Sequence, residues 1–152
     1  MVAPRKKVSR RRMLGAIAAR REIMRRDSLD NLLDFTRYTF TGEGQYVPAR
    51  HHIELAAALE DVAAGRCKRL IVSMPPQFGK SRLTTVHFPA WYLGHNPRHT
   101  VAVAGYAQGI AMYHARYSRE VFASENYDDV FPGIARHVPG ARPRCLTHRL
   151  DH

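Results

Sequence analysis

A proline pair followed by Gly-Lys-Ser constrains the fold of this chain more than any other feature. Residues 69–74 read Arg-Leu-Ile-Val-Ser-Met, a short apolar run of the kind that forms buried parallel strands. Pro75 and Pro76 end the run, because proline has no backbone N–H to give to a sheet. Gly-Lys-Ser at 79–81 then opens a helical pattern that we expect to continue toward Leu93. The order strand, loop, helix is typical of α/β proteins.

A second apolar run and several helical patterns extend this prediction. Residues 100–104 are expected to form a second strand, so that the chain contains a βαβ unit with a parallel sheet. We expect Ser28 to cap a helix at its start, Gly65 to end one, and Pro89 to kink or divide the helix in which it lies. Apolar spacing predicts further helices at 29–38, 51–64 and 107–123, with a weaker indication over 10–26. The predicted fold is therefore α/β, a parallel sheet with flanking helices behind a basic arm.

Basic residues are concentrated at the start of the chain. The whole chain of 152 residues has a formal net charge of +11. Residues 1–26 contain ten basic residues against one acidic residue, a charge of +9, so the rest of the chain is nearly neutral. Such an arm, helical or disordered, could contact nucleic-acid phosphates through Arg10, Arg11 and Arg12. The alternative is a solvated tail that keeps the chain soluble.

Composition excludes several classes of protein. The hydrophobic share of 45% is ordinary for a globular domain, which excludes a wholly disordered chain. No run of 18 uncharged apolar residues is present, so we expect no membrane span. Cys67 and Cys145 are too few for a disulfide scaffold, which favours a reducing, intracellular setting. We divide the chain into the arm 1–26, a domain at 27–135 and an irregular tail at 136–152.

Residues 77–82 are the candidate site for a nucleotide phosphate. Backbone N–H groups there would surround the phosphates, and Gly79 would allow a close approach. Lys80 would contact the β- and γ-phosphates of ATP, and the Ser81 hydroxyl would bind Mg²⁺. Met74 stands where an ordinary P-loop has glycine, and a simple strand-to-helix turn is the alternative. The candidate binding residues are Gln77, Phe78, Gly79, Lys80, Ser81 and Arg82.

The order of several short segments resembles one known family. Residues 75–81 read Pro-Pro-Gln-Phe-Gly-Lys-Ser and are similar to a variant Walker A loop, and 88–94 read Phe-Pro-Ala-Trp-Tyr-Leu-Gly. Together with residues 32–38 and with Tyr46, Pro48, His51 and His52 as an adenine-side segment, they resemble the N-terminal part of the large terminase subunit of tailed bacteriophages over 28–131.

The resemblance implies a function and a set of partners. It implies an ATP- and Mg²⁺-dependent motor with a P-loop NTPase domain of the ASCE type, here incomplete, at 27–135. The implied partners are double-stranded phage DNA, the small terminase subunit and the portal protein, and the implied assembly is an oligomeric ring in the cytoplasm of the bacterial host. Gln77 departs from the family, which often has arginine there, and Gln45 precedes Tyr46 rather than following it.

The residues for hydrolysis are not identified in this sequence. A carboxylate at the end of an apolar strand normally holds Mg²⁺ in such motors, and no apolar run here ends in Asp-Asp or Asp-Glu. We therefore expect a truncated terminase that binds ATP, lacks the hydrolytic and nuclease parts and has no assignable catalytic residue. The alternatives are a small basic nucleic-acid-binding protein, a non-functional prophage remnant and a small P-loop kinase, although no lid or acceptor site for a kinase is evident.

Overall fold

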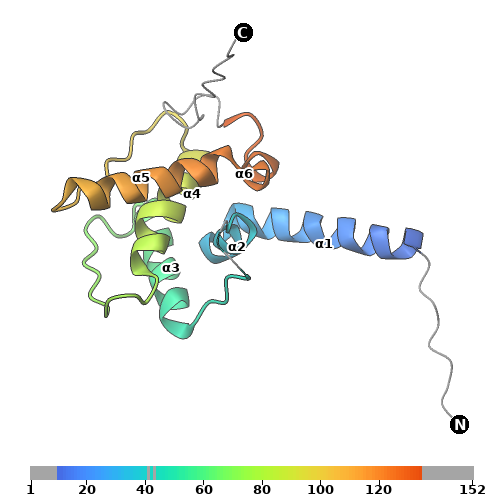
Figure 1. The fold of residues 1–152 in the computed structure, drawn as a ribbon, viewed down its shortest axis with the longest axis horizontal. Coiled ribbons are helices and arrows are strands. Elements are labelled where there is room, and N and C mark those ends of the chain that lie inside the picture. The colour runs from blue at the N-terminus through green and yellow to red at the C-terminus, as the bar shows by residue number, and fades with distance from the viewer. Residues whose placement is uncertain (1–9, 41, 43, 135–152) are drawn as a thin grey trace, which may run out of the picture.

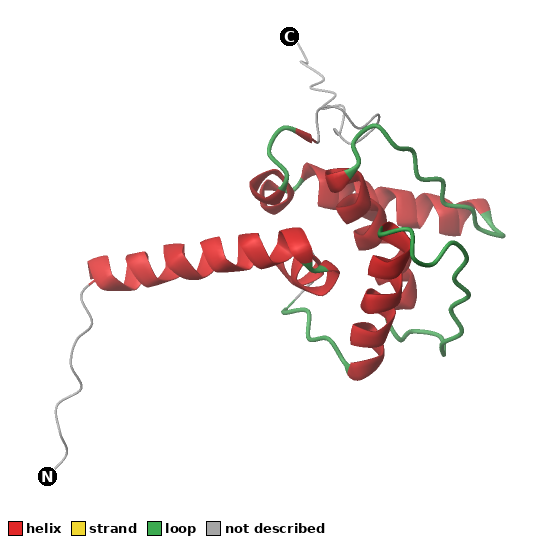
Figure 2. Cartoon of the chain, turned by 180° about the vertical axis from the view of Figure 1, so that it is seen from behind, coloured by secondary structure: helices red, strands yellow, loops and turns green. Residues whose placement is uncertain are grey.

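The structure, a computed structural model, describes residues 10–40, 42 and 44–134, with the side chain of Arg10 excepted. Residues 1–9 of the basic arm and the tail predicted at 136–152 lie outside this part. The described residues form helices joined by loops, and no strand occurs among them (Figures 1 and 2). The elements are α1 (Arg10–Asp30), α2 (Leu32–Tyr38), α3 (Arg50–Ala63), the π-helix η1 (Arg82–His87), α4 (Phe88–His95), α5 (Gln108–Ala123) and α6 (Glu125–Val130).

The predicted parallel sheet is wrong for the part of the chain that the structure describes. Residues 69–74 and 100–104 run as loops, and no backbone hydrogen bond joins these two segments. Ile71, in the middle of the first run, has an exposed fraction of 95%. A strand is stable only when a neighbour accepts its N–H groups and donates to its carbonyls, and these two short runs do not supply each other with partners. An α/β class therefore does not describe this fold.

The helices pack around Phe35 instead of covering a sheet. Phe35 of α2 is fully buried, and its ring centroid lies 6.1 Å from that of Tyr127 and 5.9 Å from that of Phe131. His87 of η1 lies edge-on to the same ring at 6.4 Å. Trp91 of α4 is also buried in this core. The other buried apolar residues of this core include Leu32, Leu55, Leu59, Leu83, Ala90, Val121 and Val130.

One helix boundary differs from the sequence prediction and another agrees with it. Asn31, not Ser28, caps α2, because its side chain accepts hydrogen bonds from the N–H groups of Leu33 (2.8 Å) and Asp34 (3.0 Å). Ser28 lies inside α1, where its hydroxyl donates to the carbonyl of Met24. The end of α3 is as predicted, with Gly65 following it at φ 75°.

The helix that follows the proline pair changes from an α-helix to a π-helix before Pro89. It begins at Lys80 and continues without a break through η1 and α4 to His95. Over η1 the backbone widens to a π-helix, and the Phe88 N–H donates to the carbonyl of Leu83, five residues back. This widening fits the expected disturbance by Pro89, since a proline ring clashes with the carbonyl four residues earlier in a regular α-helix.

Helix α1 projects away from the other helices (Figure 1). Its last turn is fixed to the core, because the Trp91 indole N–H lies 3.2 Å from the carbonyls of both Ser28 and Leu29. Two turns before the end of α1, the Arg21 guanidinium donates to the Tyr38 hydroxyl at 3.0 Å and pairs with Asp129. No helix among the described residues has the length and apolar content needed to cross a membrane.

Candidate phosphate-binding pocket

The phosphate loop, residues 75–82, joins the first apolar run to the start of η1. Two of its residues have left-handed backbone conformations, Gln77 at φ 66° and Gly79 at φ 72°. Glycine adopts this conformation freely, whereas a residue with a Cβ such as Gln77 is strained in it. Left-handed residues turn successive N–H groups toward one side of a loop, which is the backbone arrangement that binds anions.

His52 of α3 links this loop to the helical body. Its Nδ1 accepts a hydrogen bond from the Ala49 N–H at 3.0 Å, so the proton of the neutral ring is on Nε2. Nε2 therefore donates to the carbonyl oxygen of Phe78, 3.1 Å away. A Cβ on Gly79 would lie 2.6 Å from the same nitrogen. The loop can lie this close to α3 only because residue 79 has no side chain.

The hydrogen bond that Ala49 donates to His52 requires an uncharged ring. Burial, and then the neighbouring His51, lower the pKa of His52 below its usual value, while the bond to the Phe78 carbonyl raises it. A second proton on Nδ1 would face the Ala49 N–H and break the bond between them. The centroid of the His52 ring lies 5.6 Å from that of the Tyr46 ring and 4.0 Å from that of the His51 ring.

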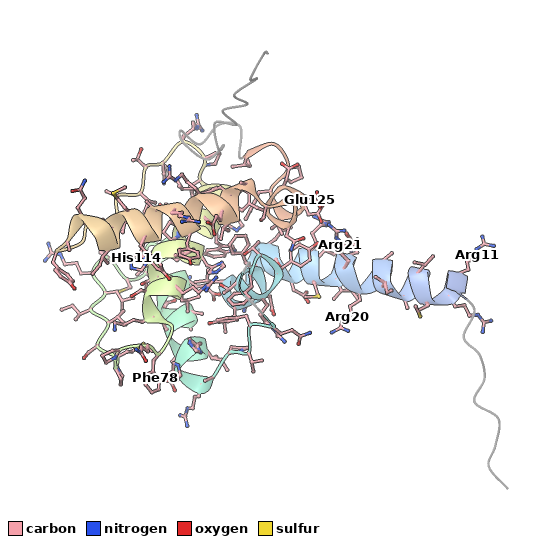
Figure 3. All side chains as sticks on the ribbon, viewed as in Figure 1. Arg11, Arg20, Arg21, Phe78, His114 and Glu125 are labelled. Carbon is pink, nitrogen blue, oxygen red and sulfur yellow. The ribbon has the colours of Figure 1, made fainter. Side chains whose placement is uncertain are left out.

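A pocket of about 250 Å³ separates the phosphate loop from α5. Five of the six predicted binding residues line it: Gln77, Gly79, Lys80, Ser81 and Arg82. The sixth, Phe78, does not, and its ring lies against that of His51 with a centroid distance of 5.5 Å. Figure 3 labels Phe78 of the loop and His114 of α5. The opposite wall is formed by Val86, Tyr113, His114 and Tyr117.

The two cations of the pocket are held in different ways. The Lys80 ammonium lies 3.3 Å from the Met74 carbonyl and 3.5 Å from that of Pro75, so it closes the loop on itself. The Arg82 guanidinium lies over the Phe40 ring at 4.4 Å and over the Tyr117 ring at 5.6 Å. Such cation–π contacts fix the group in place without using its N–H donors.

Two residues that line the pocket each carry one buried nitrogen, Nε of Arg82 and Nδ1 of His114, that has no hydrogen-bond partner in the described part of the chain. These two atoms are covered by protein, so the groups that a ligand in the pocket can reach are the other donors of the lining residues. The donor set of the pocket, a lysine, an arginine and a serine hydroxyl at the start of a helix, suits an oxyanion such as a phosphate. This is the chemistry that ATP and its Mg²⁺ ion present.

The α5 side of the pocket was not predicted as part of a site. The sequence places Tyr113 and Tyr117 on one face of a helix at 107–123, and that pattern indicates packing as readily as binding. The segment compared with the family's adenine side lies elsewhere: Tyr46 packs on Phe40 with ring centroids 5.5 Å apart and does not line the pocket. Arg11 and Arg12 lie in the part of α1 that projects from the body, and the side chain of Arg10 is outside the described residues (Figure 3).

Comparison with known proteins gave no match: no family model, no curated protein and no solved structure is similar to this chain.

Proposed function

We propose that this chain binds Mg-ATP in the pocket between the phosphate loop and α5, as the N-terminal ATPase part of a phage terminase large subunit. One observation carries the proposal: Lys80, Ser81 and Arg82 of the phosphate loop line one wall of an open pocket whose other wall is formed by rings of α5. The terminase part of the proposal rests on the order of matching segments over 28–131.

Each residue has a defined role in this proposal. Lys80 leaves the carbonyls of Met74 and Pro75 and contacts the β- and γ-phosphates. Arg82, already held against two rings, donates to a phosphate oxygen through its guanidinium group. Ser81 offers its hydroxyl to Mg²⁺, and the ion would neutralise part of the phosphate charge.

Equilibrium binding of Mg-ATP to wild type and to Lys80→Ala tests this function. Loss of a charged hydrogen bond to phosphate should weaken the affinity by about tenfold or more. Lys68→Ala is the matched control, since Lys68 is an exposed lysine just before the first apolar run and does not line the pocket. Equal affinity for Lys80→Ala and wild type, or no binding by wild type, would contradict the proposal.

Nucleic-acid binding by α1 is a second candidate, and the terminase proposal would make double-stranded DNA its ligand. Among the described residues, Arg11, Arg12 and Arg20 form no ion pair, whereas Arg25 and Arg26 both pair with Glu22. Arg11 and Arg20 also lie on the projecting part of the helix (Figure 3). Free guanidinium groups on an isolated helix are suited to contact phosphates.

Salt-dependent binding of a DNA duplex tests this second candidate. Replacing Arg11 and Arg12 with alanine should reduce the slope of log K against log salt by about 0.9 for each phosphate that the variant no longer neutralises. Arg25 and Arg26, which are paired already, provide the matched control pair. An unchanged slope in the Arg11 and Arg12 variant would exclude this part of α1 as the contact surface.

A further inference from the structure

The wall of the pocket opposite the phosphate loop is made of rings. Tyr113, His114 and Tyr117 of α5 form this ring wall. The centroids of the two tyrosine rings are 4.6 Å apart, and the Tyr113 and His114 rings are 5.5 Å apart and nearly perpendicular. Tyr113 has an exposed fraction of 57%, so much of its ring is free to contact a ligand. An open aromatic surface next to cationic groups suits a ligand that carries both a flat ring and anionic oxygens.

Arg82 connects the ring wall to the phosphate side. The Arg82 guanidinium lies over the Tyr117 ring, and Arg82 also lines the loop side of the same pocket. A ligand that occupies the pocket therefore meets a cation at the junction between the loop and the rings. This order, with phosphate groups at Lys80 and Arg82 and a ring system at Tyr113, is the order in which a nucleotide carries its phosphates and base.

His114 adds a third ring to the ring wall. Its ring is nearly perpendicular to that of Tyr113, and its Nδ1 is buried in the protein. A nucleobase has a flat face to place against such rings, whereas inorganic phosphate has none. The ring wall thus favours a base over a simple anion.

The Tyr46 segment offers no comparable surface. Tyr46 lies against Phe40 on one side and against His52, 5.6 Å away, on the other. His51 lies against Phe78 of the loop. These rings are in contact with one another, and none of them lines the pocket.

We propose that the ring wall of α5 is the base-binding subsite of the pocket, with the base stacked on Tyr113. The inference rests on the proposed function, because it concerns the same pocket. It makes the base, not only the phosphates, a source of affinity. Tyr113 is then a specificity-determining residue that separates nucleotides from inorganic polyphosphates.

The test compares Mg-ATP with Mg-tripolyphosphate, which has the phosphate chain without the nucleoside. Wild type should bind Mg-ATP about tenfold more tightly, the amount that stacking of one base supplies. Tyr113→Ala should lose this difference by weakening Mg-ATP alone, and Tyr113→Phe should keep it because the ring remains. Tyr106→Ala is the matched control, since Tyr106 is exposed just before α5 and does not line the pocket.

The outcomes distinguish this inference from the function on which it rests. Equal affinity of wild type for the two ligands, or an unchanged ratio in Tyr113→Ala, would overturn the base subsite and leave the phosphate site intact. No binding of either ligand by wild type would overturn both. Because Tyr113 is mostly exposed, its replacement should leave the helical circular-dichroism spectrum unchanged, and this is checked first.

Discussion

Two regions of this molecule are similarly apolar, but only one of them is buried. Phe35 and the residues around it are almost completely covered by α2, η1, α4 and α6, whereas the run at 69–74 leaves Ile71 95% exposed. Helices satisfy their own backbone hydrogen bonds and can bury side chains against any neighbour. An extended run has to find a partner for its backbone first. The difference shows that apolar content alone does not place a segment in the core.

Buried polar groups without a partner occur in the core as well as beside the pocket. In the core, the Tyr127 hydroxyl donates to the Ala90 carbonyl at 3.2 Å, whereas Nε2 of His87 has no hydrogen-bond partner among the described residues. Beside the pocket, Nε of Arg82 and Nδ1 of His114 are likewise without one. A buried polar atom without a partner therefore does not by itself distinguish the pocket from the core.

The largest expected effect separates the core from the exposed run. Phe35→Ala should reduce the free energy of unfolding by about 3–5 kcal/mol, because it leaves a cavity among fully buried rings. Ile71→Ala should change it by no more than about 0.5 kcal/mol, since its side chain is already in water. Chemical denaturation of both variants measures the contrast. A comparable loss in both would mean that Ile71 is buried in a packed sheet.

A smaller effect tests His87, a histidine buried in the core. Burial, with a contribution from Arg82, lowers the pKa of His87 to about 3, whereas an unfolded histidine titrates near 6.5. Below about pH 6.5 the unfolded chain therefore binds a proton that the folded chain excludes. Stability should fall by at most about 1.4 kcal/mol per pH unit from there down to the folded pKa.

The variant His87→Leu should remove this acid sensitivity. Its free energy of unfolding should change less than that of wild type between pH 6.5 and pH 4, as measured by urea denaturation at each pH. His99→Leu is the control, because His99 is exposed. Parallel pH profiles for His87→Leu and wild type would show that His87 is accessible to protons in the folded state.

The smallest of these effects concerns the contact between α3 and the phosphate loop. His52→Ala should weaken Mg-ATP binding several-fold because the loop loses its bond at the Phe78 carbonyl. His52→Gln keeps a side-chain N–H for that carbonyl and should bind nearly as well as wild type. Because the pKa of His52 is lowered, the Ala49 bond that orients its ring is intact at neutral pH and is lost as the pH falls through that pKa, although Nε2–H can still donate to Phe78.

Titrations of Mg-ATP from pH 8 downward distinguish a positioning role for His52 from a general loss of structure. The affinity of wild type should fall in acid, and that of His52→Gln should fall less. Circular dichroism at each pH confirms that both proteins remain folded, which separates this effect from that of His87. Identical pH profiles for the two proteins would show that His52 does not position the loop.

The sequence predicts the helices of this molecule better than their arrangement. The patterns at 51–64 and 107–123 match α3 and α5 closely, since apolar spacing depends only on local geometry. The strands fail for a different reason: a run such as 69–74 is compatible with a sheet, but whether it pairs depends on residues far away in the chain. Asn31 was missed as a cap because Ser28, three residues earlier, is also a good capping residue.

The loop side of the site was more predictable than the α5 side. Gly79, Lys80 and Ser81 form a contiguous motif whose chemistry can be inferred from the order of the residues. Tyr113 and His114 are about thirty residues away in the sequence, and only the packing of α5 against η1 brings them to the pocket. A pair of tyrosines at helical spacing carries no information about which face will meet a ligand.

Amide hydrogen exchange with and without Mg-ATP tests the account most directly. We predict slow exchange in η1 and α4, fast exchange at 69–74 and 100–104, and slower exchange on adding Mg-ATP in the phosphate loop and the first half of α5. Slow exchange in both apolar runs of the free protein would mean that they are paired strands. No change with Mg-ATP at either wall of the pocket would contradict the proposed site.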